Sequence, residues 1–313
     1  MKYIAKKILT LIITLFIISL LAFLSFHMID GDAATSRLGT NATPEQVEAL
    51  REEMGLKDSA LTQYFRWLSG FLQGDMGTSY KYNLPVSEMI SEKLPITATL
   101  VVMACVLMVL LSFPMGLLAA RYAGGVFDRI MTVLNQIVMA VPPVFVGILL
   151  SFVFGTVLHI FVAGNFVSYE ENATNYFVFM IFPALSIALS RTAMTVKLLR
   201  SSLLDEMNQN YIRTAYSRGH SRNSALWRHA LGNAVIPVIV FMAVSAAEMV
   251  AASIVIEQVF AIPGIGRLLL VSIFNRDFPV VQAIVVILAT WVVLVNFLAD
   301  ILAQVINPRV RLG

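Results

Sequence analysis

Glu248 and Asp300 stand out chemically in this sequence, because each lies within or near the end of a long apolar stretch. A charge at the centre of a bilayer costs about 2.5–3.5 kcal/mol on insertion scales, so such a residue is expected to face a cavity and serve a function. Two roles are open for Glu248: binding a cationic group of a substrate, or a protonated carboxyl hydrogen-bonded to a partner helix. Asp300 is near enough to the end of its stretch to stay solvated or to pair with Arg309 or Arg311.

The sequence holds no recognisable catalytic or metal-binding pattern. The histidines lack the spacing of metal ligands: His27, His159, His220 and His229. The single cysteine, Cys105, excludes an internal disulfide and any cysteine-based zinc or iron–sulfur site. A phosphate-binding GxxxxGK[ST] motif is absent, so ATP hydrolysis by that motif is not expected. We therefore expect a chain that is not an enzyme and that binds no metal or cofactor itself.

A polar, basic segment at 200–237 is longer than a turn between two apolar helices requires, and reads RSSLLDEMNQNYIRTAYSRGHSRNSALWRHALGNAVIP. Asp205 and Glu206 precede a helical stretch, and Arg213 and Arg218 lie towards its end, which is the order that the helix dipole favours. A short helix held off the membrane between two spans would act as a lever, because a soluble partner that binds it can move both spans.

The composition requires lipid. The chain has 313 residues, of which 58% are hydrophobic and 13% charged, whereas soluble chains average about 45–50% apolar and about 25% charged. A single soluble core cannot hide that much apolar surface. An ordinary cytosolic enzyme, a nucleic-acid-binding protein and a disordered protein are therefore excluded, and membrane lipid is an expected partner.

Charge-free stretches long enough to cross a bilayer indicate six transmembrane helices, since a spanning helix needs about 20 apolar residues. The stretches cover residues 8–29, 94–120, 130–169, 172–190, 229–256 and 278–299. The run 130–169 could hold one span or two, and the distribution of basic residues favours one. One span places the N-terminal lysines, the basic segment 191–228 and the C-terminal arginines together on the cytoplasmic side, with both termini. The first stretch is longer than the core of a cleaved signal peptide, so we expect it to remain as a helix.

Residues 30–93 are expected to form a small helical segment outside the membrane. The letters TPEQ at 43–46 are typical of a capping box with proline at the first helical position, and Gly55 is suited to end that helix. A second amphipathic helix is expected from Ser59. The segment could close the outer mouth of the membrane domain or contact a delivered substrate or partner. The expected organisation is an N-terminal transmembrane helix at 1–29, the outer segment at 30–93 and a five-helix core at 94–313, which contains a coupling loop at 200–232.

Arg213-Thr214-Ala215, followed after three residues by Gly219, resembles the EAA–x3–G signature in the membrane subunits of ATP-binding-cassette importers. Arg213 replaces the usual glutamate, a departure typical of the dipeptide/oligopeptide/nickel branch. Gly219 also suits the C-terminal cap of a helix. The resemblance extends over almost the whole chain, through PEQVEALREEMGL, QYFRWLSGFLQGDMGTS, VFAIPGIGRLLLVSIFNRDFPVVQ and NPRVR. It is strongest to the DppB/OppB-type permease, the first of the two permeases in such systems.

The resemblance implies an all-α type I importer (MetI-like) fold working by alternating access in a bacterial or archaeal plasma membrane. Implied partners are a second homologous permease, two ABC ATPase subunits that carry ATP and Mg, and an extracytoplasmic solute-binding protein. Each ATPase would grip a coupling helix, here at about 208–219. The implied contacts are Asn208, Tyr211, Arg213, Thr214, Ala215, Arg218 and Gly219. Glu248 is not part of the family pattern, so a place in the substrate pathway is inferred from its position alone.

Alternatives remain at the level of sequence. Short peptides are the expected cargo, and nickel or another metal chelate is the leading alternative. The basic residues of the loop could merely follow the positive-inside rule. A stand-alone secondary carrier ranks lower, because the two halves show no convincing internal repeat of the kind common in carriers.

Overall fold

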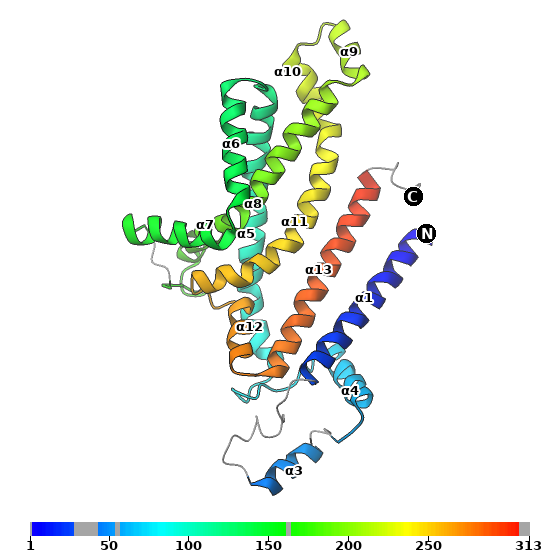
Figure 1. Ribbon diagram of the computed structural model, residues 1–313, viewed down its shortest axis with the longest axis vertical. Coiled ribbons are helices and arrows are strands. Elements are labelled where there is room, and N and C mark those ends of the chain that lie inside the picture. The colour runs from blue at the N-terminus through cyan, green and yellow to red at the C-terminus, as the bar shows by residue number, and fades with distance from the viewer. Residues whose placement is uncertain (1, 28–42, 54–56, 161–163, 307–313) are drawn as a thin grey trace. The chain divides into compact units, whose positions relative to one another are not determined.

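The computed structural model describes residues 2–27, 43–53, 57–160 and 164–306 (Figure 1). Every named element in these ranges is a helix, and the one isolated β-bridge there joins Thr78 and Pro85. The helices are α1 (Lys2–His27), α3 (Pro44–Glu53), α4 (Ala60–Leu72), α5 (Val86–Arg121), α6 (Val126–Ala140), α7 (Pro143–Leu150), the π-helix η1 (Ser151–Val157), α8 (Ala173–Met207), α9 (Asn210–Ser217), α10 (Arg222–Ala225), the π-helix η2 (Leu226–Ala230), α11 (Leu231–Val259), α12 (Ile265–Phe274) and α13 (Phe278–Ile306). The predicted all-α polytopic fold is confirmed.

Five helices in the described part of the chain are long and apolar enough to cross a membrane. They are α1, α5, α8, α11 extended back to Arg222, and α13. The predicted count of six holds when α6 and α7–η1 are taken together as one broken span, although these two helices meet at 101°.

The bend between α6 and α7 shows that the one span expected within residues 130–169 is broken at two consecutive prolines. Val141 and Pro142 each precede a proline and adopt extended backbone, with ψ values of 124° and 143°. Neither proline has an N–H to continue the hydrogen-bond ladder of α6. Pro143 instead starts a new helix, a position where its fixed φ is favourable.

Two predicted boundaries also differ from the structure. α8 does not end near 190 but runs on to Met207, so Asp205 and Glu206 lie in its last turn rather than ahead of the next helix. α5 begins at Val86, and the expected border between 93 and 94 therefore falls inside a helix. The chain forms two compact units, one of residues 1–96 with 263–294 and the other of residues 97–262 with 295–313.

In the first unit, both helices predicted for the outer segment are present with their expected caps. The Thr43 backbone N–H donates to the Gln46 side chain (3.1 Å), and the Gln46 N–H donates to the Thr43 hydroxyl (3.3 Å), which completes the capping box. The Ser59 hydroxyl accepts from the Thr62 N–H at the start of α4 (3.3 Å). The part of the expectation that concerns Gly55 lies outside the described residues.

α4 folds back onto α1 through a single buried tyrosine (Figure 1). Tyr64 is 1% exposed, and its hydroxyl lies 2.8 Å from that of Ser19. Phe16 and Phe23 meet the Tyr64 ring edge-on at centroid distances of 5.8 and 5.5 Å. The hydroxyl pair satisfies both polar groups inside an aromatic cluster, which an unpaired tyrosine could not do without cost.

A buried carboxylate fastens the loop before α5 to the turn between α12 and α13, within the same unit. Asp277 is fully buried and accepts from the Ser79 hydroxyl (2.5 Å) and the Tyr80 N–H (2.9 Å). Lys81 adds a hydrogen bond to the Asn275 side chain (3.0 Å). In the sequence, Asp277 only precedes the apolar stretch 278–299, and its partners could not be predicted because they lie almost 200 positions away.

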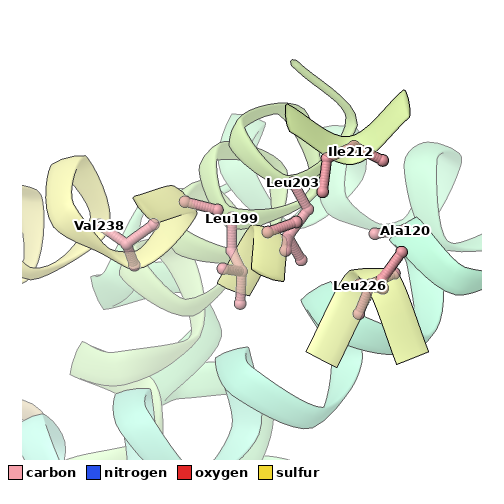
Figure 2. Close-up of a cluster of buried hydrophobic side chains, with 9 residues drawn as sticks. Ala120, Leu199, Leu203, Ile212, Leu226 and Val238 are labelled. Carbon is pink, nitrogen blue, oxygen red and sulfur yellow. The ribbon is translucent and has the colours of Figure 1, made fainter. Parts of the chain in front are cut away.

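α8 is the centre of the second unit, packing against α6, α7 and α11 (Figure 1). α5 approaches it closely at Gly116, where an added Cβ would lie 2.8 Å from the Leu199 Cδ2 and 3.1 Å from its Cβ. Leu199 belongs to a buried apolar cluster that also holds Leu203, Leu226 and Val238 (Figure 2). This cluster joins the C-terminal turns of α8 to the start of α11, so the loop between the two helices is anchored in a packed apolar cluster.

Candidate functional site

The inner face of α9 packs against this apolar cluster of α8 and α11. Ile212 is fully buried in the same cluster as Leu203 and Leu226, and Figure 2 shows it beside Leu203. Ala215, one turn further on, is 5% exposed. α9 and α10 thus form a small cap where α8 ends and α11 begins (Figure 1).

The end of α9 is a complete Schellman motif, which confirms Gly219 as the predicted C-terminal cap. Gly219 has a φ of +84°, a conformation that costs other L-residues roughly 1–2 kcal/mol. The His220 N–H donates to the Ala215 carbonyl (3.2 Å), and the Gly219 N–H donates to the Tyr216 carbonyl (2.9 Å). A Cβ added at Gly219 would meet no other part of the described chain within 4 Å.

Tyr211 braces the two arms of the loop. Its hydroxyl donates to the Glu206 carboxylate at the end of α8 and accepts from the Asn233 side-chain amide in α11 (3.2 Å). Burial, and secondly the bond to the Glu206 carboxylate, hold the pKa of the Tyr211 phenol above its ordinary value. The phenol therefore keeps its proton and its bridge throughout the physiological pH range.

The residues predicted from the loop signature divide into outward and inward groups. Arg213, Thr214 and Arg218 are exposed on the outer side of α9, where a partner can reach them. Ala215 faces inward and positions the helix instead of offering a contact surface. Asn208 is exposed but caps α8, so the helix predicted at 208–219 is shorter than expected.

An ion pair that sequence reasoning missed supports α8 beside the cluster. The Arg200 guanidinium donates two parallel hydrogen bonds to the Asp128 carboxylate, at 2.5 and 2.7 Å, and the Gly124 N–H adds a third (2.8 Å). The Asp128 side chain is 5% exposed. This fork-to-fork geometry fixes both charges and ties the start of α6 to α8.

Glu248 forms an ion pair with Arg191. The sequence had suggested instead that Glu248 binds a cationic substrate group or stays protonated against a partner helix. The Arg191 Nη1 and the Glu248 Oε2 lie 2.5 Å apart, and the side chains remain 30% and 49% exposed. Both residues lie near the middle of their helices, α8 and α11. The sequence predicts a span that ends at residue 190, just before Arg191, but Ala193, Val196 and Leu199 continue the buried face of α8 beyond it. The pairing considered for Asp300 involves arginines outside the described residues.

Long apolar helices joined by a rigidly capped polar loop define this chain as a multi-pass membrane protein of the transporter class. Family models agree over most of the chain: "Binding-protein-dependent transport system inner membrane component" matches residues 112–312, and the N-terminal model of the same components matches residues 1–101. The chain belongs to this family of permease subunits, and the resemblance seen in the sequence is confirmed.

Named relatives are similar along their full length. The chain is 35% identical over 312 residues to the oligopeptide transport system permease protein AppB of Bacillus subtilis, covering 99% of each chain. It is 32% identical over 311 residues to the glutathione transport system permease protein GsiC of Escherichia coli, again covering 99% of each.

Proposed function

We propose that this chain forms half of the pathway of an ATP-driven importer of short peptides. The names of its relatives support this cargo, since one is an oligopeptide permease and another serves glutathione, which is itself a tripeptide. The other half is a homologous permease, and a solute-binding protein delivers the peptide from outside. Two ATPase subunits bind ATP and Mg, and this chain binds no cofactor and breaks no bond. A nickel or other metal chelate is the alternative cargo left by the sequence, and no relative named above favours it.

The assembly belongs in the plasma membrane of a bacterium or archaeon. Both termini lie in the cytoplasm, because that orientation places the loop containing α9 and most basic residues of short loops on the inner side. α9 then faces the compartment that holds ATP. The ATPases reach it without crossing the membrane.

The observation that carries this proposal is the two-sidedness of α9. Ile212 and Ala215 lock its inner face to α8 and to the region where α11 starts, while Arg213, Thr214 and Arg218 are exposed on the outside. An ATPase that grips this outer face moves α8 and α11 with it, because a packed apolar cluster transmits displacement instead of absorbing it. ATP binding thus opens the pathway outward, and hydrolysis returns it inward.

Co-purification tests the assembly and the cargo together. The chain, tagged and expressed with its operon neighbours, is extracted in mild detergent, and ATPase activity is measured with the binding protein plus trialanine or a nickel–histidine chelate. We expect a second permease and two ATPases to accompany the chain, and trialanine to raise ATP turnover. Stimulation by the nickel chelate alone would overturn the peptide cargo, and a chain that purifies alone and still transports would overturn the coupling role of α9.

A further inference from the structure

The Arg191–Glu248 pair is more exposed to solvent than the Asp128–Arg200 pair of the same unit. Asp128 and Arg200 use two nitrogens and both carboxylate oxygens, and the Asp128 side chain is 5% exposed. Arg191 and Glu248 join through one nitrogen and one oxygen, and about half of the glutamate side chain is uncovered. A pair that served only to hold α8 against α11 would be expected to resemble the first, because half-exposed charges are poor fasteners.

The helix face that presents Glu248 carries a carboxylate and an amide beside its apolar residues. From Val244 onward, the exposed positions of α11 recur every three or four residues: Val244, Glu248, Ala251, Val255 and Gln258. The exposed residues of α6 include Ile130, Val133, Leu134 and Ile137, and its stretch 130–140 contains no ionisable residue. A charged residue at mid-helix is expected to face water or protein, not hydrocarbon, even with valines on the same face.

We propose that Arg191 and Glu248 form a peptide-binding site in the translocation pathway, in which Arg191 takes the C-terminal carboxylate and Glu248 the N-terminal ammonium of a short zwitterionic peptide. In the absence of peptide, the two side chains neutralise one another. An arriving peptide supplies one charge of each sign, so the internal pair is exchanged for two external pairs and no net charge is added to the membrane interior. This inference rests on the proposed peptide cargo and extends it to named residues.

A double-mutant cycle separates a binding pair from a structural one. ATP-driven uptake of labelled trialanine is measured in proteoliposomes of the complete transporter with Arg191→Gln, Glu248→Gln and the double variant. Each single variant is expected to lose roughly tenfold or more in transport rate, because it loses a hydrogen bond between the peptide and a charged side chain. The double variant is expected to be at least as impaired as either single one, because both peptide contacts are then gone.

A structural pair behaves in the opposite way. Removing both partners relieves the unpaired charge that each single variant leaves behind, so transport by the double variant would recover most of the wild-type rate and overturn the proposal. Asp128→Asn with Arg200→Gln is the matched control, since that closed pair is expected to show such a recovery.

Cysteine labelling tests the location even if the charge variants fail to assemble. In a Cys105→Ala background, Ala251→Cys adds a thiol one turn from Glu248, and Ile137→Cys adds one to the apolar face of α6. The membrane-impermeant reagent sulfonatoethyl methanethiosulfonate is expected to label the α11 variant but not the α6 control. Trialanine, delivered by the binding protein, is expected to slow that labelling.

Absence of labelling at Ala251→Cys would mean that lipid or the second permease covers this face, and would overturn the site. Labelling that trialanine does not slow would mean that water reaches the face but the peptide does not bind there, which overturns it as well. The proposed function is judged separately by uptake in the wild-type complex. If the wild type imports trialanine while these tests fail, the peptide-binding site at Arg191 and Glu248 is wrong, but the proposed import function is kept.

Discussion

At the scale of single residues, Gly219 allows backbone strain and partner contact to be distinguished. Its positive φ penalises any side chain, yet the described chain leaves room for one. Gly219→Ala and Gly219→Gln therefore share the same strain, roughly 1–2 kcal/mol, and differ only in how far they project from the loop.

We expect Gly219→Ala to retain most coupling and Gly219→Gln to lose roughly tenfold in peptide transported per ATP hydrolysed, since the longer side chain collides with an ATPase bound at α9. Transport and ATPase rates measured on the same reconstituted sample give this ratio. Equal ratios for the two variants would show that no subunit covers Gly219.

Tyr211 carries the second prediction at this scale. Tyr211→Phe removes the hydrogen bonds to Glu206 and Asn233 and is expected to cost about 1 kcal/mol of stability. Because the folded-state pKa is raised, the tyrosine contributes fully below its ordinary unfolded value of about 10, and its contribution fades as the pH rises through the folded value.

Melting temperatures of the wild type and Tyr211→Phe, measured in detergent at several pH values, check this sign. The difference is expected to be constant from neutral pH to about 10 and to shrink above it. A difference that already disappears between pH 7 and 9 would contradict the bridge.

At the scale of elements, the contact of α5 with α8 depends on a missing side chain. Gly116→Ala places a Cβ against Leu199, which is fully buried and has little room to move. We expect overpacking of about 1–3 kcal/mol, which outweighs the gain in helix propensity of about 1 kcal/mol.

Gly232→Ala is the matched control, because Gly232 is also helical but has no neighbour within 4 Å of an added Cβ. We expect Gly116→Ala to lower the melting temperature of the purified chain and Gly232→Ala to leave it unchanged or raise it. Similar effects of both substitutions would show that the α5–α8 approach is looser than described.

The elements also show how far local sequence reaches. Caps made by neighbouring residues, at Thr43 with Gln46 and at Gly219, were predictable because all their atoms come from a few consecutive positions. The length of α8 was not predictable from local sequence. A charged residue at mid-helix is stable there because Arg191 pairs with Glu248 on a different helix. Asp128 and Arg200 also pair across different helices, 72 positions apart, and the local sequence around neither residue predicts its partner.

The same limit applies to the candidate site. The loop signature placed α9 correctly in outline, since its residues are contiguous, but not the inward direction of Ala215 or the use of Asp205 and Glu206 by α8. Direction around a short helix is set by the apolar cluster it meets, and that cluster draws Ala120, Leu199 and Leu226 from three separate elements. Pro142 and Pro143 explain why the helix breaks there, but the 101° angle of the break depends on the packing of α7.

At the scale of the whole molecule, two features define the proposed work of the chain. The loop that contains α9 has an exposed basic outer face, and a solvent-exposed ion pair lies in the middle of the two apolar helices that this loop connects. Neither feature accomplishes transport alone. The proposed transport therefore requires that movement of α9 and passage of the peptide be coupled through α8 and α11.

ATP-driven uptake measures this requirement most directly. Proteoliposomes containing the chain, its second permease and both ATPases are given ATP inside and binding protein with labelled trialanine outside. We predict accumulation that needs both ATP and the binding protein, and that the double charge reversal Arg213→Glu with Arg218→Glu on the outer face of α9 abolishes. Uptake that continues without ATP, or that is indifferent to the charge reversal, would contradict a permease driven through α9.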